Sequence, residues 1–327
     1  MSDIIQADVV VVDADTLIYQ AAAVNEERTI SVTHEPTGIV KSFNTRTEFK
    51  KTMKEKQKEI TADYVICDVQ TPKDLSCTLH SIDLSINKLE AKFPFADFIY
   101  CAGDENNFRL DLPLPKRYKS GRDTTLRPKL LKAAHLYFDK KYKPQKASGY
   151  EVDDLSAILA YDYLHKGKNV LLAVPDKDAN QFVGLKLFDY TQPDKNIIEV
   201  KHWHNVELDL NRHFKSYGVP WLCYQWINGD LSDGFSAKGL AGVKIGDVGL
   251  HDLFKSCKSP KDNLYIVVNW FKESFGDSFI YNDWNGNEIT TNWKDIMGLY
   301  YKCCRMKCRE DDPLDYNEIL ERYGVSL

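Results

Sequence analysis

The sequence lacks an apolar run of the roughly 20 residues that a membrane-spanning helix needs, and its first residues form no basic and apolar leader. We therefore expect a chain without a membrane partner that stays in the cytoplasm. Paired cysteine spacings are missing too, because the eight cysteines are scattered over 327 residues, a pattern typical of reduced thiols. Cys303, Cys304 and Cys308 lie close together, but adjacent cysteines without paired histidines suit a zinc site poorly.

The excess of positive charge that nucleic-acid binding usually requires is missing from the chain as a whole, whose formal net charge is −5. The charge is unevenly distributed, however. Residues 105–150 contain twelve Lys or Arg and four Asp or Glu, so this segment is +8 and the remainder is −13. A basic block inside an acidic chain is compatible with a polyanionic partner.

Three apolar, β-branched runs predict buried strands, each followed by an acidic residue. The runs are Ala7–Val12, Phe98–Ala102 and Asn169–Val174. Helical periodicity occupies 17–23, 127–142 and 152–164 between and after them. Strands that alternate with helices predict an α/β fold with a mostly parallel sheet. Ligands bind beyond the carboxyl ends of such strands, so we expect Asp13, Asp104 and Asp176 to meet there.

Two further regions differ in character. The turn at 35–38 separates two strand-like runs, which predicts a hairpin, and the charged stretch 48–58 that follows predicts a solvated helix. After residue 218 the chain becomes a Trp-rich helix and then a Gly-rich loop. We therefore place a domain boundary there, between residues 1–218 and residues 219–327.

Acidic residues occur in five clusters at these junctions. The clusters are Asp13 with Asp15; Asp104; Glu151 with Asp153 and Asp154; Asp176 with Asp178; and Asp230 with Asp233. Any one of these acids alone would more simply be a helix cap or a solvated loop residue. Carboxylates brought together repel one another unless cations bind, and oxygen-only ligands favour Mg²⁺ or Mn²⁺. Two such ions hydrolyse phosphodiesters in many enzymes.

In this order the motifs resemble the 5′ nuclease family, which includes flap endonucleases and bacteriophage 5′→3′ exonucleases with a PIN-like fold. The matching segments are Asp13 after the first strand, Gly103-Asp104 with Phe108-Arg109, Glu151-Val152-Asp153-Asp154, Asp176-Lys177-Asp178, and Gly229-Asp230-Leu231-Ser232-Asp233. The resemblance implies two metal ions. It assigns one ion mainly to Asp13, Asp104, Glu151 and Asp153, and the second to Asp176, Asp178, Asp230 and Asp233, with Asp154 near either.

The basic block also resembles this family, in its Tyr-Lys-x-x-Arg stretch at the base of a helical arch. The stretch here runs from Arg117 to Arg122. The resemblance implies that Lys119 and Arg122 stabilise charge on the scissile phosphate. It also implies that Arg117 contacts DNA and that Tyr118 offers a ring on which a terminal base stacks.

Gly239-Leu240-Ala241-Gly242 resembles the first half of the family's helix-three-turn-helix hairpin, which grips a duplex and often holds K⁺. Gly239, Gly242 and Lys244 are the predicted contact residues. An apparent insertion before Gly246 departs from the family pattern and puts potassium binding in doubt. The implied partner is DNA with a 5′ end, nick or flap, or an RNA–DNA hybrid, bound by a monomer.

Three alternatives remain open. Asp13 and Asp230 fit a haloacid-dehalogenase-type phosphatase, but that enzyme class needs a buried strand before Asp230, where the sequence is typical of a helix. A non-catalytic PIN-like protein that binds branched DNA is the second alternative, and a PIN-type ribonuclease is the third. His202 and His204 suggest a metal site, but no third ligand accompanies them.

Overall fold

The computed structural model describes residues 6–103 and 106–327, except for the side chains of Asp123 and Thr124. Internal contacts divide the chain into two compact units. The first comprises residues 1–15, 90–125 and 144–327, and the second comprises residues 16–89 and 126–143. The boundary predicted at residue 218 falls inside the first unit, because helices beyond it share one core with Leu114 and Tyr118.

The first unit is built on a six-stranded sheet with the order β6-β5-β1-β7-β8-β9. Its strands are β1 (Val9–Asp13), β5 (Asp97–Ala102), β6 (Gln145–Lys146), β7 (Val170–Ala173), β8 (Lys186–Phe188) and β9 (Ile198–Glu199). All neighbours pair in parallel except β8 with β9. The central β1 is wholly buried, which explains its unbroken run of valines. The predicted α/β class with a mostly parallel sheet is confirmed.

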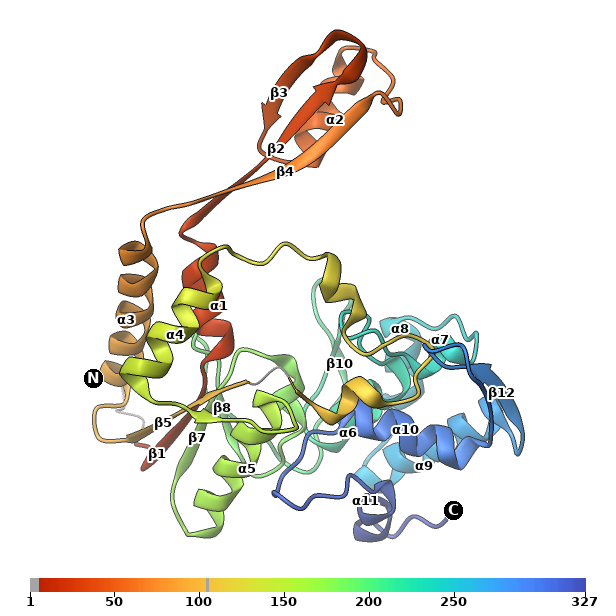
Figure 1. Cartoon of the computed structure of the whole chain (residues 1–327). Helices are drawn as coiled ribbons and strands as arrows, with labels where there is room; N and C mark the ends of the chain where they lie inside the picture. The colour runs from red at the N-terminus through yellow and green to blue at the C-terminus, as the bar shows by residue number, and fades with distance from the viewer. Residues whose placement is uncertain (1–5, 104–105) are drawn as a thin grey trace. The chain divides into compact units, whose positions relative to one another are not determined.

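Helices of the first unit supply the remainder of its core. They are α5 (Val152–His165), α6 (Val219–Asn228), α7 (Ala237–Leu240), α8 (Asp247–Phe254), α9 (Pro260–Phe275), α10 (Trp293–Cys304) and α11 (Tyr316–Arg322). The unit also contains the short 3-10 turns η2 (Phe108–Asp111), η3 (Ser120–Thr124) and η4 (Lys177–Gln181). Two small antiparallel hairpins pair β10 (Glu207–Leu208) with β11 (Phe214–Lys215), and β12 (Phe279–Asn282) with β13 (Glu288–Thr291). Helix α5 contacts β1, β5 and β7, whereas α6 packs on α9 and α10 (Figure 1).

The second unit contains the predicted hairpin and the charged helix. Its elements are α1 (Asp15–Ala23, from Thr16 on), β2 (Glu26–His34), η1 (Glu35–Thr37), β3 (Ile39–Phe43), α2 (Arg46–Glu55), β4 (Tyr64–Pro72), α3 (Leu75–Lys92, up to Leu89) and α4 (Leu131–Tyr142). Strand β2 lies between β3 and β4 and is antiparallel to both. Asp83 of α3 joins this helix to α4 through Tyr137, Lys141 and Tyr142. In the described part of the chain, no helix is long and apolar enough to cross a membrane.

Candidate active site

The strand register brings the predicted junctions to one edge of the sheet. In the parallel ladders, Asp13 of β1 lies opposite Cys101 of β5, and Val12 lies opposite Ala173 of β7. The three strands therefore end side by side. Asp176 follows β7 after a three-residue step, and Asp104 follows β5 but lies outside the described residues.

The carboxylates at this edge are close enough to oppose one another's ionisation. Burial, reinforced by the charges of Asp15 and Asp176, raises the pKa of Asp13 from 3.8 to about 8. Burial and then the charges of Asp13, Asp176 and Glu151 hold the pKa of Asp153 well above its usual range. These residues come from β1, from the start of α5 and from the end of β7, so the fold gathers acids that are distant in the sequence.

A second part of the acidic group lies around η4 and the start of the 230–235 loop. Burial, followed by the charges of Asp176, Asp230 and Asp233, raises the pKa of Asp178. Burial alone would raise the pKa of Asp230 as well, but hydrogen bonds from Ser232 and the nearby Lys177 charge hold it below its usual value. The Lys177 Nζ atom lies 3.1 Å from Asp230 Oδ2.

The glycine before Asp230 is required by a close backbone approach. Gly229 has a φ of +72°, and a Cβ atom placed there would lie 2.2 Å from the Phe235 carbonyl oxygen. Asp230 and Phe235 form an isolated antiparallel bridge. The Gly-Asp pair therefore closes a tight loop that ends α6 and carries Asp230 and Asp233.

Cationic side chains of the basic block pair with this acidic group. The ammonium of Lys119 forms an ion pair with Glu151, and Arg122 Nη2 lies 2.5 Å from Asp233 Oδ1. Lys119 has a left-handed φ of 59°, which costs a non-glycine residue roughly 1–2 kcal/mol. Its backbone N–H donates to the Asp233 carbonyl oxygen at 2.7 Å, which holds the turn in place.

The stacking role predicted for Tyr118 needs correction. Its side chain is only 1% exposed and packs on Phe235, with 6.0 Å between ring centroids. The Tyr118 hydroxyl lies 3.2 Å from Glu151 Oε2 and 3.1 Å from Asp233 Oδ2. Burial and then the charges of these two carboxylates raise the Tyr118 pKa, which keeps the hydroxyl protonated. The Tyr118 hydroxyl therefore lies between the carboxylates of Glu151 and Asp233, and its ring has no exposed face on which a base could stack.

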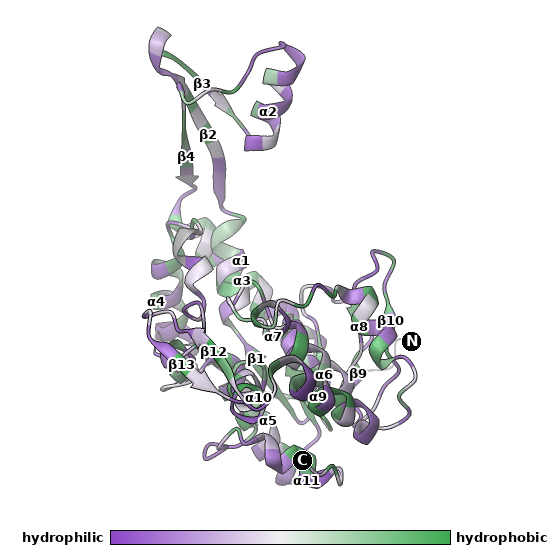
Figure 2. Cartoon of the chain, turned by 90° about the vertical axis from the view of Figure 1, so that its right-hand side faces the viewer, coloured by the Kyte–Doolittle hydropathy of each residue, from purple (hydrophilic) through white to green (hydrophobic). Residues whose placement is uncertain are grey.

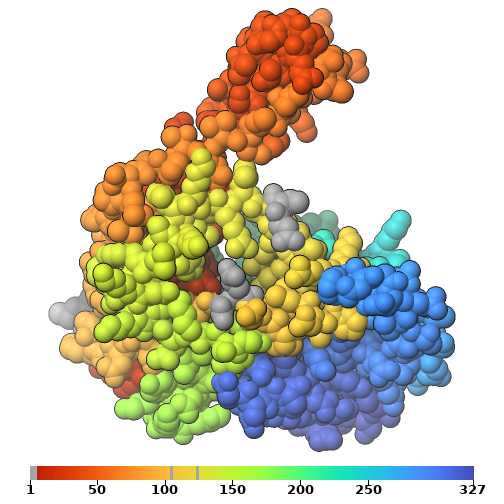
Figure 3. Space-filling model, viewed as in Figure 1, coloured from red at the N-terminus to blue at the C-terminus, as the bar shows by residue number. Residues whose placement is uncertain are grey.

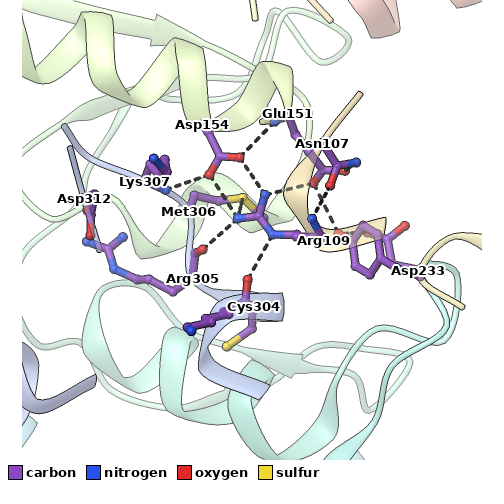
Figure 4. Close-up of polar contacts among 12 residues, drawn as sticks. Asn107, Arg109, Glu151, Asp154, Asp233, Cys304, Arg305, Met306, Lys307 and Asp312 are labelled. Carbon is purple, nitrogen blue, oxygen red and sulfur yellow. Dashed lines mark hydrogen bonds and ion pairs between the residues drawn. The ribbon is translucent and has the colours of Figure 1, made fainter. Parts of the chain in front are cut away.

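The metal-binding role considered for Asp154 needs correction too. Its carboxylate is fully buried and accepts two hydrogen bonds from Arg109, at 2.6 and 3.0 Å (Figure 4). It also accepts from the backbone N–H groups of Glu151 at 3.0 Å and Lys307 at 2.7 Å. With four donors on two oxygens, Asp154 has no capacity left for a cation. It joins the start of α5 to the carboxyl-terminal segment.

The donor chemistry of the acidic group fits a hard divalent cation. The group offers carboxylate oxygens without sulfur or nitrogen ligands, and a divalent cation would relieve the repulsion that raises the pKa values of Asp13, Asp153 and Asp178. The Gln225 side chain donates to Asp178 Oδ1 at 2.5 Å, while its own Oε1 atom is buried without a hydrogen-bond partner in the described chain. A hydrated ion beside Asp178 would satisfy that oxygen. Among the described residues, no three His, Cys, Asp or Glu side chains already converge at ligand distance.

The carboxyl-terminal hairpin supports the basic block, a contact that the sequence did not indicate. Arg117 lies over the Trp284 ring at 5.6 Å, and Trp284 donates from its indole nitrogen to the Leu112 carbonyl at 3.2 Å. The Tyr281 hydroxyl donates to the Pro113 carbonyl at 2.7 Å. Figure 3 shows these yellow and blue segments side by side on one face.

The predicted hairpin region does form two helices around a turn. Helices α7 and α8 flank residues 241–246, where Gly242 has a φ of +71° and Lys244 is exposed. Gly239 donates its N–H to the Ser236 hydroxyl, which caps α7, and Lys238 donates to the Ile245 carbonyl at 2.6 Å. The turn is thus closed by its own residues. Contact of Gly239, Gly242 and Lys244 with a duplex stays a prediction.

Two other residue groups have structural explanations. Asp15 accepts the Gly103 N–H with both carboxylate oxygens, at 3.2 and 3.1 Å, and thereby fixes the end of β5. His202 contacts the Tyr323 hydroxyl at 2.5 Å, and His204 accepts the Lys201 N–H at 2.9 Å. The two histidines are thus engaged in separate hydrogen bonds.

The segment before Asp230 is the helix α6, and β-strand geometry is absent from residues 219–228. The haloacid-dehalogenase-type alternative needs a buried strand at this position. The geometry therefore disfavours that alternative.

Comparison with known proteins gives matches among solved structures only. No protein-family model and no curated protein matches the sequence. The chain is similar to the 5′-exonuclease of bacteriophage T5 with bound zinc ions, with a TM-score of 0.45 and 16% identity over 80% of this chain and 78% of that one. A bacteriophage T5 protein co-crystallised with metal ions matches with a TM-score of 0.43 and 14% identity over 80% and 77%. The flap endonuclease of bacteriophage T5, in a pseudo-enzyme–product complex with DNA and metal ions, matches with a TM-score of 0.41 and 15% identity over 58% and 70%.

Proposed function

We propose that this chain is a metal-dependent, structure-specific 5′ nuclease that hydrolyses DNA phosphodiesters. One observation carries the proposal: acids from β1, α5, η4 and the 230–235 loop repel one another, and two of them, Glu151 and Asp233, are paired with the cationic Lys119 and Arg122. Acids alone would repel a phosphate, and cations alone would bind it without hydrolysis. Their combination suits metal-assisted cleavage of a polyanion.

The residues divide into two groups by chemistry. Asp13, Glu151 and Asp153 would hold one Mg²⁺ or Mn²⁺ ion, and Asp104 joins them by its motif. A second ion would be held by the acids of η4 and of the 230–235 loop, which are Asp176, Asp178, Asp230 and Asp233. When bound, such ions supply an activated water and neutralise the leaving oxygen.

Lys119 and Arg122 contribute the charge that carboxylates cannot. Each is paired with an acid in this structure, Lys119 with Glu151 and Arg122 with Asp233. A substrate phosphate must therefore compete with these two carboxylates for the cations. When the phosphate has displaced the two carboxylates, the cations stabilise the charge that develops on the scissile phosphate.

The substrate in this proposal is a DNA duplex with a 5′ end, nick or flap, or an RNA–DNA hybrid. A monomer would bind this substrate through the α7–α8 hairpin, where K⁺ could also bind. Such an activity serves primer removal, replication or recombination.

Cleavage assays on blunt, nicked and flapped duplexes labelled at the 5′ end test the proposal. With Mg²⁺ the chain should release short 5′ products, and EDTA should stop the reaction. Asp153→Ala should lose cleavage and keep binding, whereas Asp162→Ala, an exposed acid paired with Lys166 near the other end of α5, should keep both. Full cleavage by Asp153→Ala would refute the mechanism. Hydrolysis of an aryl phosphate without DNA cleavage would favour the phosphatase, and DNA binding without cleavage by the unsubstituted chain would favour the non-catalytic alternative.

A further inference from the structure

The second unit contains a small module that the proposed chemistry does not use. It comprises residues 26–72, which form β2, β3, α2 and β4. Phe49 and Met53 of α2 are buried, and they pack with Ile30 and Val32 of β2 as one apolar cluster. Helix α2 begins at a capped turn, since the Thr45 hydroxyl accepts the Glu48 N–H at 3.0 Å. One face of the helix is thereby fixed against the sheet.

This orientation decides where the lysines of α2 point. Successive helical residues are rotated by about 100°, so Lys51 lies opposite Phe49 and Met53, and Lys50 and Lys54 lie on one flank of the helix between the two sides. All three are exposed. Figure 2 shows the corresponding purple colour over much of α2. Lys50 and Lys54 are one turn apart, about 6 Å along the helix axis.

The same side of the module carries further positive charge. Lys41 of β3 lies opposite the buried Val32, which places it on the α2 side of the sheet, and Lys56 and Lys58 follow the helix. We call these six lysines the α2 basic face: Lys41, Lys50, Lys51, Lys54, Lys56 and Lys58. Residues 39–58 contain seven Lys or Arg against two Glu, within a chain of net charge −5.

Few of these lysines form close ion pairs, although residues 26–72 as a whole contain eight Lys or Arg and eight Asp or Glu. In the described part of the chain, Arg46 pairs with Asp68 and Lys51 lies 3.9 Å from Glu55, but the other five lysines of the α2 basic face have no ion pair within 4.0 Å. Like charges at Lys50 and Lys54 oppose helix formation by roughly 0.2–0.5 kcal/mol. Within the helix, this repulsion is offset by the Lys51–Glu55 pair at i,i+4 and by the position of Lys54 in the last turn.

The charge is also one-sided. The other face of the three-stranded sheet carries one charged side chain, the acidic Glu27 of β2. Its remaining residues are uncharged: Thr29, Ser31 and Thr33 of β2, Val40 and Ser42 of β3, and Val65, Cys67, Val69 and Thr71 of β4. A solubilising distribution would place charge on both faces. The lysines of the sheet and helix instead lie away from the uncharged residues of that face, and Asp68 on the α2 side is paired with Arg46.

We propose that the α2 basic face binds the phosphodiester backbone of the nucleic acid, at a region separate in sequence from the 105–150 block. The inference rests on the proposed function for the identity of the polyanion. Lysine ammonium groups act as mobile point charges and read no bases. The only aromatic side chain of α2, Phe49, is buried, so stacking on a base is excluded. The contact is therefore independent of sequence and sensitive to salt.

A charge-matched pair of variants tests this. The triple variant Lys50→Gln, Lys51→Gln and Lys54→Gln removes three charges from the α2 basic face. The control triple Lys166→Gln, Lys168→Gln and Lys195→Gln removes three exposed lysine charges from the first unit. Both variants change the net charge of the chain equally. Binding of a fluorescein-labelled flapped duplex is followed by anisotropy in EDTA, where cleavage does not interfere, from about 50 to about 200 mM KCl.

The α2 triple should bind at least about tenfold more weakly than the control triple, and its log–log salt slope should be shallower by about 1 to 3, because each phosphate contact contributes about 0.9. Lys→Arg at the same three positions should restore both quantities. Equal affinities and equal slopes for the two triples would overturn the proposal, as would an unsubstituted chain that binds no nucleic acid. Cleavage by the unsubstituted chain, measured separately with Mg²⁺, reports on the proposed nuclease, so the failure of one proposal is distinguishable from that of the other.

Discussion

Asp153 and Asp154 are neighbours of the same type, and we predict opposite effects of the same substitution at the two positions. Asp154→Asn should destabilise the first unit strongly. All four partners of the Asp154 carboxylate are donors, two from Arg109 and two from backbone N–H groups. An asparagine has one acceptor oxygen, so its amide nitrogen would face donors, and the fully buried Arg109 would lose its paired charge.

Removal of one partner from a buried ion pair costs about 3–5 kcal/mol, a large share of the 5–15 kcal/mol by which domains are usually stable. With a urea m-value of about 3 kcal/mol/M, the unfolding midpoint should fall by about 1 M or more. Asp153→Asn removes instead a charge that Asp13, Asp176 and Glu151 repel. Its midpoint in EDTA should rise, while its cleavage activity should disappear.

Tryptophan fluorescence suits this measurement, because all six tryptophans lie between residues 203 and 293 and so within the first unit. The signal reports that unit without interference from the second. The double variant Arg109→Met with Asp154→Leu should recover much of the loss, because an apolar pair replaces both charges together. An Asp154→Asn midpoint within 0.2 M of the unsubstituted chain in this assay would refute the scaffold role, and so would an equal loss in Asp153→Asn.

Three further predictions concern pH, backbone and charge. In EDTA the free energy of unfolding should fall by at least about 1.4 kcal/mol per pH unit from about pH 4 to about pH 8, because the unfolded state releases the Asp13 proton near pH 4 whereas the folded state, in which the pKa of Asp13 is raised from 3.8 to about 8, still holds it; urea titrations of Asp13→Asn should show a shallower slope, and the remainder comes from Asp153 and Asp178, whose pKa values are also raised. Gly229→Ala should lower the thermal midpoint more than Gly276→Ala, since both have positive φ but only Gly229 would drive a Cβ atom against Phe235; equal shifts would contradict the contact. Lys119→Met should reduce kcat by roughly 10²–10³ and change duplex affinity little, as single-turnover kinetics and anisotropy would show; a loss of affinity alone would contradict its assignment.

The sheet was predictable because its signals are local. A run of valines with no polar interruption indicates a strand buried on both faces, and an acid directly after it indicates the carboxyl edge. The parallel register of β1 with β5 and β7 then brings Asp13 and Asp176 to one edge without further information. Strand β4 of the second unit had no such signal, because polar and apolar residues mix along it.

The division of labour inside the Glu151–Asp154 motif was not predictable. Adjacent helical residues are rotated by about 100°, so Asp153 turns toward the acidic group and Asp154 toward Arg109. Which residue faces which way depends on how α5 packs on the sheet and on the segment around Lys307, a tertiary contact across more than 150 positions. The motif alone shows two adjacent aspartates after Glu151 and does not distinguish the environments of their side chains.

Tyr118 shows a related ambiguity. An aromatic residue within a basic run is typical of a surface that stacks bases, and local sequence offers nothing against that interpretation. The ring is buried because Phe235, over 110 residues later, packs on it. In the same way, Trp284 supports Arg117 from a hairpin that carries no recognisable motif.

Ion pairs with the acidic group fix the positions of the Lys119 and Arg122 side chains of the basic block. Glu151 and Asp233 lie beside Lys119 and Arg122, and these pairs lower the cost of gathering acids at one edge. An ion bound by Glu151 or Asp233 would compete with the side-chain cation and leave it for phosphate. Binding of metal and binding of the polyanion should then favour each other, as thermodynamic linkage requires of two ligands that displace the same contact.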